Sequence, residues 1–548
     1  MDRLKRIATK VDNLLKVEQE DGWIGKSRWS NKDLDPVPKE KRTWGTFSVL
    51  SYWCSDQFAP SSWSLGSSMI TLGLTCREAI PLTFFGFFLC AIIIVLNGTI
   101  GVRTHCSFPV IVRASLGMWG SYPAILVRCI LSLLWLAIQT YLAGNLTEQL
   151  IGSIWPSFLK IENTFPADMG ITRAQFIGFI LFWLVQTPLS CIPVHKIRIL
   201  FLVKTAICPL GYCAIAVWGL AATGGKGPML SGSYTPVEGT NKAIAIFSAI
   251  NALAGLYSTL QVNVPDFVRF SKNDKANWWQ IFFIPLTGTI PVACGIISTA
   301  AAKQLYGVEA WDTATLISLW GGSSGARAAK AFSSAMFLLS TIGVNISANS
   351  ISFATDITGL FPRYLTILRA TIGAGILTLA IQPWQIVNGS SSFYAFINAY
   401  PCFLAPLACI MFMDWFWLRK GKVDIRDLYR PDGPYRYTFG FNWRAYLAWI
   451  CALAPNIPGL AHAVNPAKNP DVQPYTYYFS WGFAVAASCV VYPLINLAFP
   501  PTASFVDRAV YELEDVEDAL PPVTYEGSTS SEGDLEKKGD SSAGVIAV

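Results

Sequence analysis

The chain has 548 residues, of which 52% are apolar and only 14% are charged, and its mean hydropathy is positive. Soluble domains carry nearer a quarter of charged residues, so this composition excludes an ordinary soluble protein. The formal net charge of +6 hides an acidic, Ser- and Gly-rich segment at residues 500–548, which we expect to be a disordered cytoplasmic tail. The positive charge elsewhere lies in loops, where it indicates topology and gives no support to nucleic-acid binding.

Twelve apolar segments are each long enough to cross a bilayer, which takes roughly 20 residues. No apolar run precedes residue 47, so the first span is expected to act as the signal for insertion. Lys and Arg gather in alternate connections, and the positive-inside rule then places both termini in the cytoplasm. The predicted spans cover residues 47–72, 79–97, 121–152, 172–192, 197–222, 243–263, 279–301, 331–355, 366–383, 391–417, 443–463 and 477–499.

Two spans are predicted to be interrupted, at corresponding places in two halves of five spans each. Pro60 lies near the middle of the first span, and the sixth contains Gly255 and is followed by Pro265. Interrupted spans in matching positions are typical of transporters with a substrate site near mid-membrane. Pro and Gly are also common in ordinary membrane helices, so this pattern alone leaves both interpretations open.

Two pairs of polar side chains occur at helical spacing inside the third and eighth spans. Trp135 and Gln139 are four residues apart, as are Asn345 and Asn349, so each pair projects from one face of its helix. An indole offers a flat surface and an amide offers a donor beside an acceptor, which together suit the N–H and C=O of a lactam or ureide. Helix packing through the same side chains is an equal alternative, and one Asn could tie helices together while the other faces a ligand.

Several ionisable side chains fall inside the predicted spans or near their ends. Asp56 in the first span is a candidate for proton coupling, because an intramembrane carboxylate is costly to keep without a function. Lys204 in the fifth span is a second candidate, although a side chain that snorkels to the cytoplasmic interface is the favoured interpretation. Asp356 lies near the end of the eighth span, and Asp414 precedes a basic cluster with which we expect it to form an interfacial ion pair.

Motifs for other kinds of chemistry are absent from the sequence. It has no Walker A phosphate loop and no HExxH or GxSxG motif, so neither an ATP-driven pump nor a hydrolase is indicated, and we expect no enzyme activity. The 13 Cys residues include no CxxC pair, which argues against a zinc site and against a disulfide framework. We therefore expect no metal or organic cofactor.

Seven short segments stand out along the chain: 31–37 (NKDLDPV), 107–110 (SFPV), 193–198 (PVHKIR), 265–270 (PDFVRF), 345–350 (NISANS), 360–364 (LFPRY) and 441–444 (FNWR). Read together, they resemble the fungal uracil and allantoin permeases of the nucleobase–cation symporter-1 family. They occur in the family's order and span about residues 30–500. The resemblance implies an all-α, LeuT-like fold: a cytoplasmic tail (1–46), two inverted repeats of five helices (47–222 and 243–417) and two peripheral helices (443–499).

The same resemblance implies a substrate site between spans one, three, six, eight and ten. Trp135 corresponds to a tryptophan on which the substrate ring stacks, and Gln139 and Asn349 correspond to amides that bond the ring. Tyr257 falls where some relatives place a second aromatic side chain, so a ring could lie between Trp135 and Tyr257. Phe393, at the start of the tenth span, corresponds to a gating phenylalanine.

The chain departs from the family pattern at two places. Relatives that take uracil or allantoin usually have Gln at the position of Ser64, which offers one hydroxyl in place of an amide. Sodium-coupled relatives have hydroxyl residues at the positions of Gly343 and Val344. Because sodium needs oxygen ligands, their absence makes a sodium site incomplete and points to the proton as the coupling ion.

The sequence therefore predicts a plasma-membrane, proton-coupled importer of a small planar heterocycle, working by alternating access. Uracil, allantoin and uric acid are the candidate substrates. A related permease for thiamine, nicotinamide riboside, or cytosine and purines stays open as an alternative, as does a nutrient receptor that signals without transport. Lys537 and Lys538 in the acidic tail are expected sites for a ubiquitin ligase and the endocytic machinery.

Overall fold

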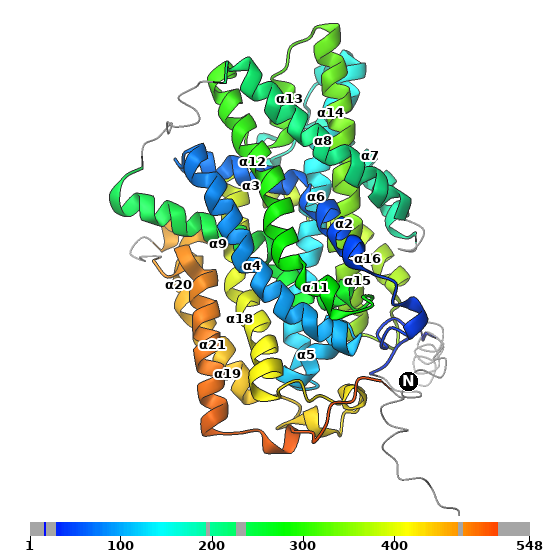
Figure 1. The fold of residues 1–548 in the computed structure, drawn as a ribbon. Helices are drawn as coiled ribbons and strands as arrows, with labels where there is room; N and C mark the ends of the chain where they lie inside the picture. Colours follow the sequence, from blue (N-terminus) through cyan, green and yellow to red (C-terminus); the bar gives the residue numbers. More distant parts are fainter. Residues whose placement is uncertain (1–15, 18–28, 193–197, 226–236, 470–474, 513–548) are drawn as a thin grey trace, which may run out of the picture. The chain divides into compact units, whose positions relative to one another are not determined.

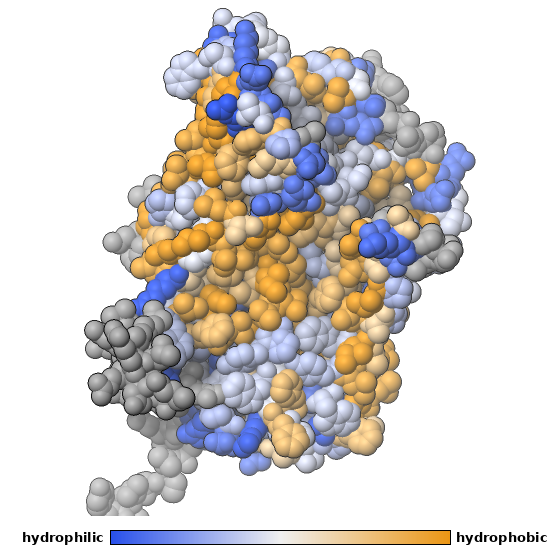
Figure 2. Space-filling model, turned by 180° about the vertical axis from the view of Figure 1, so that it is seen from behind, coloured by the Kyte–Doolittle hydropathy of each residue, from blue (hydrophilic) through white to orange (hydrophobic). Residues whose placement is uncertain are grey.

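The computed structural model describes residues 16–17, 29–192, 198–225, 237–469 and 475–512. Within these residues the chain forms helices joined by loops, and nine of the helices are long and apolar enough to cross a membrane. Figure 2 shows apolar residues gathered over the middle of one face, with hydrophilic residues toward its upper and lower ends. A lipid-facing band of this kind is what a helical membrane protein requires. Lys537 and Lys538 lie outside the described residues.

The helices follow the predicted spans in chain order (Figure 1). The first half is built from α2 (Thr46–Gln57), α3 (Pro60–Thr71), α4 (Cys76–Thr104), α5 (Phe108–Leu116), α6 (Ser121–Ile154), α7 (Arg173–Ser190) and α8 (Arg198–Ala222). The second half is built from α9 (Gly239–Asn263), α10 (Pro265–Val268), α11 (Asp274–Trp278), α12 (Gln280–Tyr306), α13 (Thr313–Ser318), α14 (Ser324–Val344), α15 (Ile351–Leu360), α16 (Ile367–Ala380), α17 (Ser390–Ala399) and α18 (Pro401–Phe412). The last spans are α19 (Trp443–Leu453) with α20 (Ile457–Val464), and α21 (Ser480–Ala498); α19 and α21 pack on each other and on α18.

The first span is interrupted, as predicted. Phe58 and Ala59 leave the helical conformation between α2 and α3, and Pro60 begins α3. A broken helix frees backbone groups that need partners inside the protein. Ser340 of α14 supplies one of these partners, because its hydroxyl donates to the carbonyl of Phe58.

The predicted interruption of the sixth span is wrong. α9 is helical from Gly239 through Gly255 to Asn263, and it ends there, with one residue between it and the start of α10 at Pro265. Gly255 serves close packing, since a Cβ added there would lie 2.4 Å from the carbonyl oxygen of Ile397 at the end of α17. A glycine required by a neighbouring helix has the same sequence signal as a glycine that breaks a helix.

The eighth span contains a π-helix that the sequence did not reveal. This element, η5 (Asn345–Ser350), joins α14 to α15, and a second one, η7 (Met413–Leu418), follows α18. Wider turns of this type are rare inside α-helices and are frequent at functional sites. η5 includes both of the asparagines that the sequence singled out.

Glycines let α3 approach α12 closely enough for their backbones to touch. A Cβ on Gly66 would lie 2.3 Å from the carbonyl oxygen of Val292, and one on Gly295 would lie 2.4 Å from that of Trp63. Small residues at a membrane helix interface allow this kind of approach. The contact fixes α3, which forms one wall of the site described below.

Part of the predicted disordered tail is packed on the helices. Residues 500–512 belong to the described chain, and Val510 exchanges backbone hydrogen bonds with Val423 (3.0 Å) and Ile425 (3.1 Å). The prediction of disorder is therefore wrong for residues 500–512. The acidic, Ser- and Gly-rich composition that predicted disorder lies further along the chain, from Glu512 onward.

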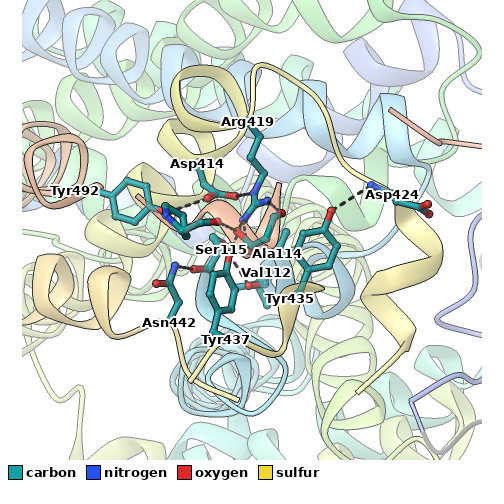
Figure 3. Close-up of polar contacts among 12 residues, drawn as sticks. Val112, Ala114, Ser115, Asp414, Arg419, Asp424, Tyr435, Tyr437, Asn442 and Tyr492 are labelled. Atoms are coloured by element: carbon teal, nitrogen blue, oxygen red, sulfur yellow. Dashed lines mark hydrogen bonds and ion pairs between the residues drawn. The ribbon is translucent and has the colours of Figure 1, made fainter. Parts of the chain in front are cut away.

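Asp414 forms the predicted ion pair with the basic cluster, and the pair is buried inside the protein. Its carboxylate lies 2.7 Å from Nε of Arg419, and the two side chains are 4% and 1% exposed. Figure 3 shows that Arg419 also reaches the carbonyl of Ala114 on α5 (3.1 Å) and that Tyr492 of α21 donates to Asp414 (2.8 Å). Arg419 further donates to the carbonyl of Ser504 (2.7 Å). One buried pair thus joins η7, α5, α21 and the segment after α21.

Replacing Arg419 by Met should destabilise the purified protein by about 3 kcal/mol or more, because the Asp414 carboxylate would be left buried without its cation. Asp414→Leu should have a comparable effect. The double variant should lose clearly less than the sum of the two single losses, because it leaves neither charge unpaired. Thermal unfolding in detergent measures all three. Strict additivity of the two losses would show that the ion pair does not couple these segments.

Candidate substrate site

A small cavity lies where the broken first span meets spans three, six and eight. Concave sites lined by apolar side chains with a few placed polar groups are typical of small-molecule binding. Its lining combines aromatic, amide, hydroxyl and carboxylate side chains with small apolar ones. The lining residues are Asp56, Ser61, Ser62, Trp135, Gln139, Leu256, Tyr257, Thr259, Leu260, Val344, Ala348 and Asn349.

Trp135 lines the cavity from α6 and is held by aromatic side chains of the tenth span. Its indole N–H donates to the hydroxyl of Tyr400 (3.0 Å), and its ring meets Phe396 edge-on at a centroid distance of 5.3 Å. Phe393 also meets it edge-on, at 6.4 Å, and packs on Trp311. Phe393 is fully buried and is not among the lining residues. Its predicted gating role stays a prediction.

Gln139 lies one turn further along α6 and reaches across the cavity to α3. Its amide nitrogen donates to the hydroxyl of Ser61 (2.8 Å), while its Oε1 has no partner within the described part of the chain. Ser61 and Ser62 are site residues that the sequence analysis missed. Their signal was present, because they directly follow the helix break at Pro60 and so begin α3 beside the cavity.

Ser64, which was predicted to contact substrate, lies elsewhere. It is fully buried one turn beyond Ser61 in α3 and is not a lining residue. Its carbonyl accepts from the hydroxyl of Ser68 (2.7 Å). Its predicted contact with substrate stays a prediction.

The two asparagines of η5 have separate places. Asn349 lines the cavity, whereas Asn345 is fully buried behind it and donates to the amide oxygen of Gln186 on α7 (2.6 Å). The side chain of Asn345 also accepts from the amide nitrogen of Asn349 (2.7 Å). The sequence left open which asparagine packs helices and which faces a ligand. In the structure Asn345 ties helices together, and Asn349 faces the cavity.

Tyr257 lines the cavity from α9 but does not touch Trp135. Its ring packs edge-on against Phe87 at 5.1 Å and lies 6.0 Å from Trp53. No ring contact joins Tyr257 to Trp135 among the described residues, although both border the cavity. The predicted stacking of a substrate ring between them is compatible with this arrangement and stays a prediction.

Asp56 and Lys204 are the two ionisable residues that the sequence proposed for proton coupling. Asp56 lines the cavity, and its Oδ1 has no hydrogen-bond partner among the described residues; the same is true of Nζ of Lys204. Lys204 is fully buried on α8 and does not snorkel to the interface, so the favoured interpretation from the sequence is wrong. Its side chain lies over Gly343, where an added Cβ would be 2.5 Å from Cδ of Lys204. The absence of a side chain at Gly343 makes this burial possible.

Comparison with known proteins assigns the chain to a family. Residues 36–483 match the family of permeases for cytosine and purines, uracil, thiamine and allantoin. The chain belongs to this family. It is therefore a permease and not an enzyme, and the LeuT-like class of fold predicted from the sequence is confirmed.

The permease resembles several fungal proteins along most of its length. It is 33% identical to the allantoin permease of Saccharomyces cerevisiae over 484 residues, which cover 86% of this chain and 76% of that one. It is 31% identical to the uracil permease of the same yeast over 485 residues, covering 86% and 76%. An uncharacterized permease of Schizosaccharomyces pombe is 32% identical over 525 residues, covering 93% and 88%.

Among solved structures the permease shares its fold with Mhp1, a nucleobase–cation-symport-1 family transporter. The closed conformation with bromovinylhydantoin bound matches with a TM-score of 0.67 at 20% identity, covering 86% of this chain and 97% of that one. The inward-facing conformation matches with a TM-score of 0.69 at 21% identity, covering 93% and 100%. At these identities the likeness establishes the fold alone.

Gly343→Ala should destabilise the purified permease by about 1–3 kcal/mol, because the new methyl group would overlap the buried Lys204 side chain. Gly373→Ala is the matched control, since nothing lies within 4 Å of a Cβ at that helical position. The control should be neutral or slightly stabilising. Thermal unfolding of both variants measures the difference, and equal behaviour would place Lys204 away from Gly343.

Proposed function

We propose that this permease imports a planar nucleobase or ureide across the plasma membrane together with protons. The observation that carries the proposal is the meeting of Trp135, Gln139 and Asn349 at one cavity. The indole face can pack against a flat ring, and the two amides can bond its polar edge. The similarity to an allantoin permease and a uracil permease supports substrates of this class, with uric acid as a further candidate.

Alternating access follows from the same site. Binding between the broken first span and spans three, six and eight lets helices of the two halves close on the ring from either side of the membrane. Phe393 and Trp311 would complete the closure above Trp135, against which Phe393 already packs. A nutrient receptor could share this cavity, and transport experiments separate the two.

Proton coupling is supported by the charges beside the cavity. Gly343 and Val344 offer no side-chain oxygen where sodium-coupled relatives have hydroxyl groups, and hard cations need oxygen ligands. The ammonium-bearing side chain of Lys204 lies over Gly343 instead, with the Asp56 carboxylate at the cavity wall. We assign Asp56 and Lys204 to the coupling step, in which a proton on Asp56 would accompany the substrate.

The proposal includes a plasma-membrane location with both termini in the cytoplasm. The distribution of Lys and Arg among the loops supports this orientation. Lys537 and Lys538 would then be accessible to a ubiquitin ligase, which would remove the permease by endocytosis.

Cells that lack their own nucleobase permeases should take up radiolabelled uracil or allantoin saturably when they express this protein. Uptake should be greater at pH 5 than at pH 8, because protons drive it. Gln139→Ala should reduce uptake about tenfold or more, since the substrate edge would lose a hydrogen bond that no other group replaces. No uptake of either compound, with the protein present at the cell surface, would refute the proposed substrates.

Asp56→Asn should separate binding from coupling. The variant should lose accumulation by about tenfold or more because it has no carboxylate to protonate, while exchange of internal for external substrate persists. Uptake and counterflow in the same cells provide the two readouts. Glu309→Gln is the matched control, because Glu309 lies in a partly exposed ion pair with Lys303. Counterflow lost together with uptake would argue against Asp56 as the coupling group, and absence of counterflow in the wild type would favour a receptor.

A further inference from the structure

A chain of buried hydrogen bonds runs behind the cavity from Thr140 to Asn349. The hydroxyl of Thr140 decides which atom of each following amide donates and which accepts. Thr140 of α6 donates its hydroxyl hydrogen to the backbone carbonyl of Leu136 (2.6 Å). A carbonyl oxygen can only accept, and a hydroxyl has a single hydrogen to give. The oxygen of Thr140 is therefore left as an acceptor for every other neighbour.

The hydroxyl of Thr140 orients the amide of Gln186 on α7, and Gln186 in turn orients Asn345. Its amide nitrogen donates to the hydroxyl oxygen of Thr140 (3.0 Å), so its Oε1 is turned toward Asn345. Asn345 must then present its nitrogen, which donates to Oε1 of Gln186 (2.6 Å) and also to Thr140 (3.3 Å). The amide oxygen of Asn345 is thereby turned toward Asn349.

Asn349 is the last member of the chain and the one that reaches the cavity. Its amide nitrogen donates one N–H to the oxygen of Asn345 (2.7 Å), so Oδ1 lies on the side of the amide group that is turned away from Asn345, and Asn349 lines the cavity. Thr140, Gln186 and Asn345 are at most 2% exposed, so these bonds are shielded from bulk water. Reversal of any one amide would set two oxygens or two NH₂ groups against each other, a buried mismatch that is strongly disfavoured.

Gln139 is under no such constraint. Its partner is the hydroxyl of Ser61, which can donate as well as accept. The amide of Gln139 can therefore turn either its oxygen or its nitrogen to a ligand. The two amides at the cavity thus differ: that of Gln139 can turn either way, whereas that of Asn349 is held in one orientation.

We infer that Asn345, with Gln186 and Thr140 behind it, is a positioning residue that holds Asn349 as a hydrogen-bond acceptor toward the substrate. The inference rests on the proposed function and narrows its substrate class. The ring must offer an N–H to Asn349, as a lactam, imide or ureide does. A ring that offers only an acceptor at that position is rejected, because two oxygens would face each other in a closed site.

Competition against labelled uracil tests the donor requirement in intact cells. The competitors are uracil and its two isosteres in which a ring oxygen replaces N1–H or N3–H (1,3-oxazine-2,4-dione and 1,3-oxazine-2,6-dione). The wild type should bind at least one isostere about tenfold or more weakly than uracil. If labelled allantoin is the compound that is taken up, hydantoin and oxazolidine-2,4-dione form the equivalent pair.

Thr140→Val tests the positioning, because it removes the hydroxyl that sets the direction while it keeps the shape of the side chain. The three amides can then reverse together, and the ratio of inhibition constants should fall to within about threefold. Thr140→Ser keeps the hydroxyl and should preserve the wild-type ratio. Asn345→Leu, which lets Asn349 turn freely, should also lower the ratio.

Failure of the inference and failure of the proposed function give different results. Transport with an unchanged ratio in Thr140→Val and Asn345→Leu would overturn the positioning role alone. A wild type that accepts both isosteres as well as uracil would overturn the donor requirement. A wild type that transports neither uracil nor allantoin would overturn the proposed function, and this inference with it.

Discussion

A polar group buried in a membrane protein must find its partner inside the protein, because the surrounding hydrocarbon offers none. In this permease the carbonyl that the helix break frees at Phe58 is met by the hydroxyl of Ser340. Behind the cavity, Asn345 is satisfied by Gln186 and Asn349. The same constraint therefore holds the broken first span to the eighth span, and holds the π-helix η5 to its neighbours.

Two polar atoms at the site are among those in the described part of the chain that have no such partner. The oxygen of Gln139 and one oxygen of Asp56 have no partner among the described residues, and both side chains border the cavity. Trp135 has its N–H bonded to Tyr400, so its ring is oriented while its face stays available. A planar heterocycle with polar edges would complete the bonds that the protein leaves open, which links the architecture to the proposed substrate class.

Most of what could be predicted from the sequence came from the pattern of apolar and polar residues along the chain. The polytopic helical fold follows from apolar length, and the break at Pro60 follows from proline chemistry. A spacing of four residues placed Trp135 and Gln139 on one helix face, and the family resemblance implied their place in a site. Properties that depend on neighbours could not be predicted. Gly255 proved to be a packing residue, because the close backbone of Ile397 cannot be read from the chain. The depth of Lys204 depends on the missing side chain at Gly343, and η5 depends on hydrogen bonds that its residue types do not specify.

A structure of the purified permease with bound uracil or allantoin tests the central claim most directly. The ring is predicted to lie in the cavity with one face on Trp135, its edge bonded to Gln139, and a ring N–H pointing at Oδ1 of Asn349. Asn345 should remain bonded to Gln186, without contact to the ligand. A ligand bound outside this cavity, or one that presents a carbonyl oxygen to Asn349, would contradict the account.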